Sequence, residues 1–258
     1  MMIQPRTPQP KVPAHFTRRF GFESKALVWQ GECIEMTARQ LFATALTALV
    51  SIGLSNTSKA VDADFKPMFD GKSTTGWTKP FDWGEVAVAD GEIILTGSKK
   101  FFLVTEKTYK NFVLEGEVFC PKGGNSGFQF RCHFQKNKLW GYQAEVDTSD
   151  RKWAGGLYDE GRRGWLVSLK DKPEAQAAFK NDAWNKYRIE AVGDHLKIFV
   201  NGVQTVDYHD SMDAEGHIAL QHHGEKGLTY KFRNVQLKTL PDSPANKAAQ
   251  AQATDSKN

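Results

Sequence analysis

The sequence predicts an all-β fold, in which one domain forms a sandwich or jelly roll. Short runs of β-branched and aromatic residues are separated by turn signals roughly every 8–12 residues, the spacing of such folds. Two of these turns, Asp90-Gly91 and Asn201-Gly202, are two-residue hairpin signals between alternating segments. The 22 Gly, 17 Phe and 7 Trp favour turns and strands. With 40% hydrophobic and 25% charged residues, the chain is not collagen-like, coiled-coil or wholly disordered.

Twelve segments between residues 64 and 240 are expected to be strands, because each is short, β-rich and bounded by turn signals. In chain order they are 85–89, 92–96, 101–105, 112–119, 127–134, 141–147, 155–158, 184–191, 196–200, 203–208, 217–222 and 229–237. Only 173–180 has a helical pattern, and it is short. The body 64–240 has the length of one domain, and the polar tail 241–258 is predicted to be disordered.

Residues 36–63 have the pattern of a signal peptide. Arg39 precedes a 14-residue apolar stretch, 41–54, which is short for a membrane span but suits a signal-peptide core. Small residues occupy the cleavage position in Ser58-Lys59-Ala60 and in Val61-Asp62-Ala63. We therefore expect Met36 to be the start, residues 1–35 to be an upstream or disordered extension, and the mature protein to be secreted or periplasmic without a membrane span. The alternative for this segment is an N-terminal amphipathic helix.

The positive net charge lies mostly in that N-terminal region. The whole chain has a formal charge of +4, but residues 1–63 contain seven Lys and Arg against four Asp and Glu. The remaining 27 basic and 26 acidic residues leave the body near neutral. We therefore expect no nucleic-acid partner.

Cys120 and Cys132 are the cysteines of the exported body. If 112–120 and 127–134 form a hairpin about Gly123-Gly124-Asn125, Cys132 lies too far from Cys120 for a disulfide. We expect two buried free thiols. The sequence has no CxxC motif and no zinc-like cysteine spacing.

Three of the expected strands have an apolar side and a polar side, since alternate strand residues point to opposite faces. The polar sides hold Gln129, Arg131 and His133, then Gln143, Glu145 and Asp147, and finally Gln221 and His223. These residue types bind sugars, metals or carboxyl groups, so we interpret the surface as a binding face. The alternative is the solvated outer face of a sandwich. Aromatic residues suited to stacking on sugar rings occur at Trp140, Trp153, Tyr158 and Trp165.

Short motifs follow one another in a specific order across residues 66–240. They are Met68-Phe69-Asp70-Gly71-Lys72 with Gly76-Trp77, Gly124-Asn125-Ser126-Gly127-Phe128-Gln129-Phe130-Arg131, Gly141-Tyr142-Gln143-Ala144-Glu145, Gly155-Gly156-Leu157-Tyr158-Asp159-Glu160-Gly161-Arg162-Arg163-Gly164, Trp184-Asn185-Lys186-Tyr187-Arg188-Ile189, Val200-Asn201-Gly202-Val203, Ile218-Ala219-Leu220-Gln221-His222-His223-Gly224 and Phe232-Arg233-Asn234-Val235. In this order and spacing, the body resembles the 3-keto-disaccharide hydrolase domain family. One departure is His222, where the family often has Asp or another polar residue.

The resemblance implies a concanavalin-like jelly roll of two curved antiparallel sheets with the site on the concave face. It also implies export in many members and activity on glycosides oxidised to a ketone at C3. Such a ketone acidifies the C2 proton, so a base can remove it and the C1 leaving group can depart by elimination, followed by addition of water. This chemistry needs a base near C2, an electrophile for the ketone oxygen and a proton donor for the leaving oxygen.

We assign candidate roles on this basis. The candidate catalytic residues are Glu145, His223 and Arg131. The candidate substrate-binding residues are Gln129, Gln143, Tyr158, Glu160, Arg163 and Gln221. A divalent metal ion could serve as the electrophile, with Glu145, His223, His133 and Asp147 as the available ligands. Arg131 could instead form a salt bridge with Glu145, and Arg162 and Arg163 could be loop anchors or solvated charges.

Two other functions fit the same residues. A non-catalytic carbohydrate-binding jelly roll would use the same polar face and aromatic residues. An ordinary glycosidase would use a carboxylate pair, for which Glu145 and Asp147 are two residues apart on one strand face. In each case the expected partner is an oligosaccharide or another glycoside.

Overall fold

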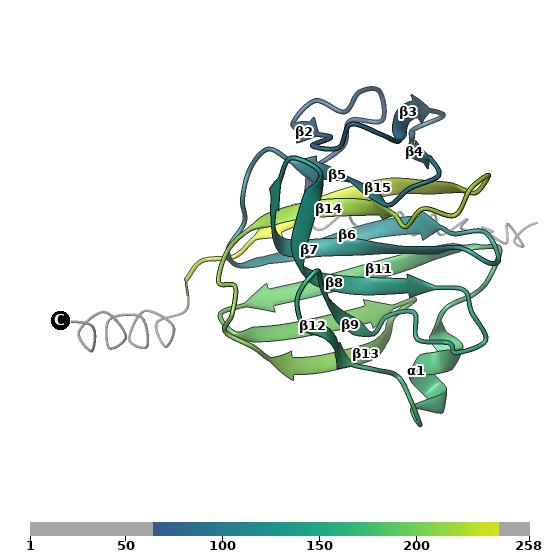
Figure 1. Cartoon of the computed structure of the whole chain (residues 1–258). Coiled ribbons are helices and arrows are strands. Elements are labelled where there is room, and N and C mark those ends of the chain that lie inside the picture. The colour runs from purple at the N-terminus through teal and green to yellow at the C-terminus, as the bar shows by residue number, and fades with distance from the viewer. Residues whose placement is uncertain (1–63, 243–258) are drawn as a thin grey trace, which may run out of the picture. The chain divides into compact units, whose positions relative to one another are not determined.

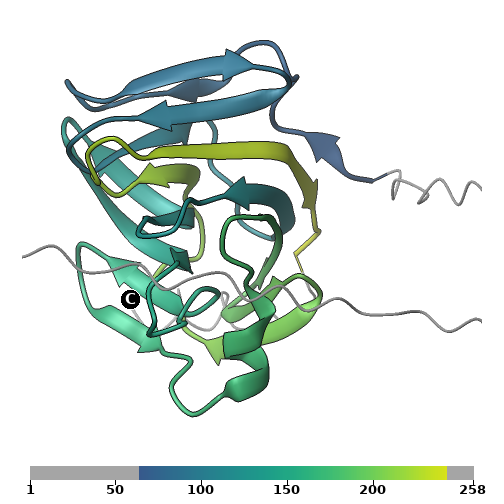
Figure 2. The same ribbon diagram turned by 90° about the vertical axis from the view of Figure 1, so that its right-hand side faces the viewer.

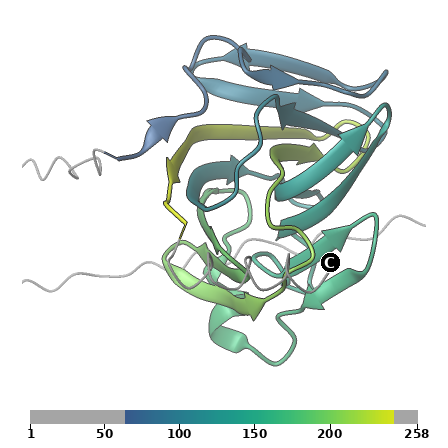
Figure 3. The ribbon, with the colours of Figure 1, turned by 90° about the vertical axis from the view of Figure 1, so that its left-hand side faces the viewer.

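Two antiparallel β-sheets pack against each other in the computed structural model, which describes residues 64–242 (Figure 1). This confirms the predicted sandwich of two antiparallel sheets. In Figures 2 and 3 the β3–β4 hairpin lies at the top of the molecule and the helix α1 at the bottom. The two lie at opposite ends because β3 and β13, the strand nearest to α1, are the two edges of one sheet.

The larger sheet has eight strands in the order β13-β12-β11-β6-β15-β4-β3, with β1 pairing additionally with β15. Its strands are β1 (Lys66–Pro67), β3 (Glu85–Ala89), β4 (Glu92–Thr96), β6 (Phe112–Phe119), β11 (Trp184–Val192), β12 (His195–Val200), β13 (Val203–His209) and β15 (Thr229–Thr239). Its edge hairpins close through the predicted turns. Asp90-Gly91 and Asn201-Gly202 adopt positive φ at both residues, as this kind of two-residue turn requires.

The smaller sheet has seven strands in the order β10-β9-β8-β7-β14-β5-β2. They are β2 (Trp77–Thr78), β5 (Phe101–Thr105), β7 (Asn125–Gln135), β8 (Lys138–Asp147), β9 (Leu157–Glu160), β10 (Gly164–Val167) and β14 (His217–His222). The predicted helix is present as α1 (Pro173–Ala178) and begins with the proline, which needs no hydrogen-bond partner there. The long central strand β8 and its neighbour β9 carry much of the site described below.

The core lies between the two sheets. Phe128 of β7 contacts both Tyr187 of β11 and Phe232 of β15, with ring centroids 5.3 Å apart in each pair. All three side chains are buried. The side of the smaller sheet opposite Phe128 therefore faces away from the larger sheet, and it carries the polar residues of β7 and β8.

The pairing of two central strands rules out a hairpin that the sequence left open. A hairpin of 112–120 and 127–134 was one arrangement compatible with the sequence, but β6 pairs with β11 and β15, whereas β7 pairs with β8 and β14. The chain crosses between the sheets at this Gly-rich turn instead of folding back on itself. The predicted free thiols are confirmed: Cys120 and Cys132 are both buried and unpaired, and burial raises the pKa of each.

Smaller differences concern short strands. The strands β1, β2 and β10 were not predicted, and the strand expected at 155–158 begins two residues later, as β9. The predicted extension 1–35, signal peptide 36–63 and nearly all of the tail 241–258 lie outside the described residues. No helix within residues 64–242 has the length and apolar character needed to cross a membrane.

Candidate functional site

A cavity of about 570 Å³ lies on the polar side of the seven-stranded sheet. Polar and aromatic side chains of β8, β9 and β10 line it, together with the first residue of β7 and residues that flank the ends of β5, β7, β8 and β14. The predicted residues that line it are Gln143, Glu145, Asp147, Tyr158, Glu160 and His223. The polar face predicted from strand parity therefore contains a cavity lined by several of the predicted residues.

Glu145 is held firmly at the wall of this cavity and is only 4% exposed. Its backbone pairs on one side with the Gly155-Gly156 segment, and its carbonyl accepts a hydrogen bond of 2.8 Å from the hydroxyl of Tyr187. Its carboxylate accepts hydrogen bonds of 2.5 Å from Asn125 Nδ2 and from Gln143 Nε2. Burial raises the pKa of Glu145 to about 7, although these two donors oppose the shift.

Gln143 connects Glu145 to a second glutamine deeper in the sheet. Its Oε1 accepts a hydrogen bond from Gln129 Nε2, while its own Nε2 binds Glu145. Gly127 makes room for this arrangement, because a Cβ atom there would lie 2.6 Å from Gln143 Cδ. Gln129 is fully buried and lies behind the cavity wall, so it supports Gln143 and does not itself line the cavity.

A second polar group centres on Glu160 of β9. Lys100 Nζ lies 2.6 Å from Glu160 Oε1, and Gln221 Nε2 lies 3.4 Å from Glu160 Oε2. Lys100 and Glu160 line the cavity, whereas Gln221 is fully buried behind them. The cavity therefore contains a cation, Lys100, in addition to the carboxyl group of Glu145.

Asp147 has its carboxylate fully engaged. One oxygen accepts hydrogen bonds of 2.8 Å from Arg151, and the other accepts one of 2.9 Å from the backbone N–H of Ser149. Arg151 in turn lies over the rings of Trp153 and Trp165, at 4.9 and 5.2 Å from their centroids. Asp147 thus anchors the loop that follows β8, which places Arg151 at the cavity, over the ring of Trp165 from β10.

His223 follows β14 and is 46% exposed. Its Nδ1 lies 2.7 Å from Glu225 Oε1, and the other oxygen of Glu225 accepts a hydrogen bond of 2.6 Å from Tyr230. This pair fixes the ring from its Nδ1 side. The neighbouring His222 points to the core, where it stacks on Phe101, and burial lowers its pKa. The predicted parity of this strand is therefore confirmed.

Arg131 lies elsewhere, which contradicts the predicted common face of Gln129, Arg131 and His133. The register of β7 shifts between Phe130 and His133, and Arg131 adopts a positive φ of 46°. This bulge turns the fully buried guanidinium away from Glu145 and towards backbone carbonyls. It forms no salt bridge with Glu145.

His133 and Arg163 also lie outside the cavity lining. His133 Nε2 lies 2.9 Å from Asp213 Oδ1. Arg163 forms ion pairs with Asp159 and Asp210, the latter at 2.7 Å. Arg163 thus anchors the loop between β9 and β10.

The side chains do not converge as a metal site in the cavity. Within residues 64–242, one group of His and Asp residues has its ligand atoms within 4.8 Å of one another. Glu145, Asp147 and His223 do not belong to this group. The oxygens of Asp147 are taken by Arg151 and Ser149, and those of Glu145 by amide donors. The donors present do not fit a metal ion in this arrangement, and a metal at this cavity stays a prediction.

Several cavity residues were not predicted. Asn125 lies within a motif noted in the sequence, but its contact with Glu145 was not foreseen. Lys100 and Arg151 come from chain segments whose position depends on how the loops pack, whereas Trp165 is one of the aromatic residues that the sequence suggests for stacking on sugar rings. Only the Gly-rich surroundings of Asn125 gave any local signal.

Two solved structures with a similar fold carry names that describe carbohydrate-related proteins. The carbohydrate-binding module CBM66 from Bacillus subtilis is 21% identical with a TM-score of 0.51, covering 64% of this chain and 96% of the module. A candidate glycosyl hydrolase from Parabacteroides distasonis is 22% identical with a TM-score of 0.50, covering 68% of this chain and 99% of that one. At these identities the likeness shows the fold alone. The comparison with curated proteins gives no match.

The family is shown by a direct match to a sequence model. The model of the 3-keto-alpha-glucoside-1,2-lyase-like domain matches residues 64–238, which include every strand that carries the cavity. The resemblance noted in the sequence is therefore confirmed, and the chain belongs to the 3-keto-alpha-glucoside-1,2-lyase-like domain family.

Proposed function

We propose that this protein cleaves glycosides oxidised to a ketone at C3, with Glu145 as the base that removes the C2 proton. Family membership supports a carbohydrate-related function. The observation that carries the finer proposal is Glu145 itself, a nearly buried carboxyl group at the cavity with a pKa of about 7. A base with a pKa near the working pH combines a usable ionised fraction with a strong driving force for proton transfer.

The reaction balances without a redox partner. The Glu145 carboxylate takes the C2 proton, and the electron pair of the C2–H bond forms the enolate on the C3 oxygen. The enolate then collapses to restore the C3 ketone and form a C1–C2 double bond, while the C1–oxygen bond breaks. The leaving oxygen takes a proton, and water adds across the new double bond to give the free 3-keto sugar.

Other cavity residues can meet the remaining requirements of the reaction, which are an electrophile for the ketone oxygen and a proton donor for the leaving oxygen. Lys100 is a cation available to stabilise the enolate oxygen, in addition to Arg151, which is bound to Asp147. The contact of Lys100 with Glu160 fixes its position. His223 is the side chain available to protonate the leaving oxygen, because its Nδ1 is already occupied by Glu225 and its Nε2 has no partner among the described residues. Gln143 and Tyr158 can bind hydroxyl groups, and Trp165 offers an aromatic face for a sugar ring.

The carboxylate pair of an ordinary glycosidase is less well supported. Asp147 is held by Arg151 and by a backbone N–H, so its oxygens are occupied and its charge is compensated. A retaining or inverting mechanism needs two carboxyl groups that can each act on the substrate. Burial raises the pKa of Glu145 to about 7, which suits it to act as a base without a second carboxyl group.

The substrate experiment compares a 3-keto-glucoside with its unoxidised parent, with and without a chelator. We expect cleavage of the keto substrate only, because only the ketone acidifies the C2 proton. Equal rates on both compounds would show an ordinary glycosidase. Binding of both without turnover would show a carbohydrate-binding module. Loss of activity with chelator, restored by a divalent ion, would put a metal into the mechanism.

Export is a further expected result, based on Arg39 and the apolar stretch 41–54. We expect the natively produced protein to begin near residue 61 or 64 and to be secreted or periplasmic. Intact-mass measurement of the protein from its native host tests this. A mature chain that still contains residues 1–39 would contradict it.

A further inference from the structure

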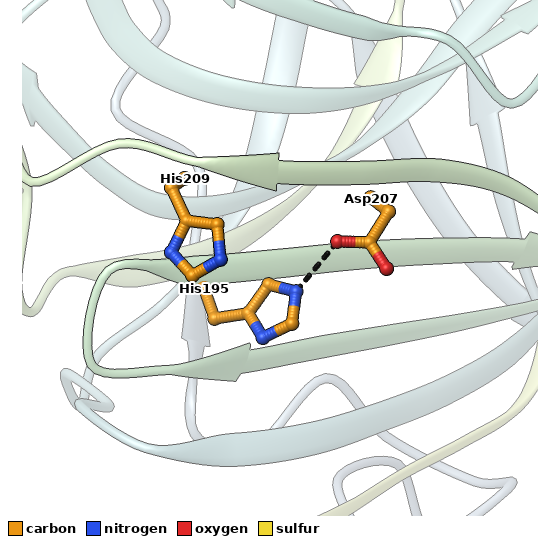
Figure 4. Close-up of side chains that lie close together, drawn as sticks. All are labelled: His195, Asp207 and His209. Atoms are coloured by element: carbon orange, nitrogen blue, oxygen red, sulfur yellow. Dashed lines mark hydrogen bonds and ion pairs between the residues drawn. The ribbon is translucent and has the colours of Figure 1, made fainter.

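Two histidines and an aspartate come together on the β12–β13 hairpin (Figure 4), which belongs to the eight-stranded sheet, whereas Glu145 lies on β8 of the seven-stranded sheet. His195 and His209 are directly opposite each other in the strand register, and Asp207 precedes His209 by two residues on the same face. The two imidazole rings stack with centroids 4.2 Å apart and planes 13° apart. One ligand atom from each of the three residues lies within 4.8 Å of the others.

This cluster is accessible and already partly oriented. The side chains of His195, Asp207 and His209 are 32%, 51% and 61% exposed. His195 Nε2 lies 2.7 Å from Asp207 Oδ1, and Gln204 Nε2 donates to the other oxygen of Asp207 at 3.0 Å. Figure 4 shows both rings and the carboxylate on one side of the hairpin. None of the three residues lines the cavity that contains Glu145.

A carboxylate outside the cluster orients the second histidine. His209 Nδ1 lies 3.3 Å from Asp194 Oδ1. A carboxylate on one ring nitrogen leaves the other available as a ligand and makes it more basic, which is the usual outer-shell arrangement of metal-bound histidine. A backbone hydrogen bond of 2.8 Å from Asp210 N to Asp194 O closes the end of the hairpin opposite its turn.

We propose that His195, His209 and Asp207 bind a divalent transition-metal ion such as Zn²⁺. Two imidazoles and one carboxylate suit zinc, nickel, cobalt or copper, whereas calcium and magnesium prefer oxygen ligands throughout. Around tetrahedral zinc, donor atoms lie about 3.3 Å apart for bonds of about 2.0 Å, so the three groups need to close by roughly 1–1.5 Å. Side-chain rotation provides this at an exposed site, and Asp207 exchanges its contact with His195 for the ion.

The position of the site gives the ion a structural effect. Among the strands of residues 64–242, β13 is an edge strand of the larger sheet and pairs with β12 alone. An ion held by His195 from β12 and by Asp207 and His209 from β13 links the two strands through their side chains. Because the site exists only in the folded hairpin, the ion stabilises the folded state. This inference does not depend on the proposed reaction.

The test is a titration of the full chain, without a polyhistidine tag, with Zn²⁺, and separately with Co²⁺ and Mg²⁺. We expect one zinc ion per chain by calorimetry, a melting temperature that rises with Zn²⁺ concentration, and visible Co²⁺ absorption bands of a low-symmetry site. Mg²⁺ is expected to have no effect. His195→Gln and His209→Gln are each expected to weaken zinc binding at least about 10-fold and to remove the zinc-dependent rise in melting temperature.

Matched controls separate this site from others. His223→Gln, in the cavity, is expected to bind zinc like the wild type. Because His195 and His209 lie outside the catalytic cavity, their double variant is expected to keep full turnover of the 3-keto substrate. Unchanged zinc affinity in both hairpin variants would overturn the proposal, as would loss of zinc binding in His223→Gln alone, which would place the ion in the cavity.

Discussion

Glu145→Gln is expected to lower the turnover of a 3-keto-glucoside by about 10² or more, the range expected when a positioned general base is lost. Glutamine has nearly the same shape but cannot accept the C2 proton. Glu92→Gln is the matched control, because Glu92 lies on the other sheet and binds only Lys231, at 2.8 Å. Initial rates at saturating substrate measure the effect. Near-wild-type turnover in Glu145→Gln would remove Glu145 from the mechanism.

The pH dependence of turnover and of stability provides a second test of the role of Glu145. Since the base must be ionised, wild-type turnover is expected to rise with pH through about 7, the pKa of Glu145. Stability should change in the opposite direction. The folded pKa is raised from 4.5, so the folded protein binds more protons than the unfolded chain between those values. The stabilisation that comes from the raised pKa of Glu145 is fully present below about pH 4.5 and is lost as the pH rises through about 7.

Glu145→Gln has no such titration. The free energy of unfolding of the variant relative to the wild type is therefore expected to increase by about 2 kcal/mol between pH 5 and pH 8. Urea unfolding of both proteins at the two pH values measures this difference. A constant difference would show that burial does not raise the pKa of Glu145, and it would weaken its assignment as a base tuned to neutral pH.

The fold could be predicted because its signals are local. Alternation of polar and apolar residues gave the strands, and Asp90-Gly91 and Asn201-Gly202 gave two of the hairpins. Which distant strands pair is not a local property. The Gly-rich turn after β6 looks like a hairpin in sequence, yet β6 and β7 belong to different sheets.

The bulge in β7 shows why part of the site could not be predicted. Nothing in the residues around Arg131 indicates it, but glycines in two neighbouring segments accommodate it. A Cβ atom at Gly141 would lie 2.6 Å from Cys132 Cα, and one at Gly216 would lie 2.5 Å from the carbonyl carbon of Arg131. These glycines are recognisable as partners of the bulge only when the pairing of β7 with its neighbours is known. Strand parity therefore placed Glu145 correctly and Arg131 wrongly.

The position of Arg131 leads to the largest stability effect that we expect. Its guanidinium is fully buried and donates to the backbone carbonyls of Lys110 at 2.6 and 3.0 Å, Gly193 at 2.6 Å and Asp213 at 3.1 Å. These carbonyls belong to three separate connections: the segment before β6, the β11–β12 turn and the loop between β13 and β14. Burial lowers the pKa of Arg131 from its ordinary value, since the charge loses its hydration and the nearby carboxylates of Asp213 and Asp194 offset this loss only in part.

Arg131→Met fills similar space but offers no donor, so three backbone carbonyls that surround the buried guanidinium lose a partner. Each unsatisfied buried polar group costs about 1–3 kcal/mol, and we expect a total destabilisation of about 3 kcal/mol or more. For a domain of this size the melting temperature should fall by about 6–12 °C. Arg188→Met is the matched control: Arg188 is 37% exposed and forms surface ion pairs with Glu190 and Glu115, so its loss should cost at most about 1 kcal/mol. If Arg131→Met instead melts like the wild type and loses turnover, Arg131 acts in catalysis and its buried contacts contribute little to stability.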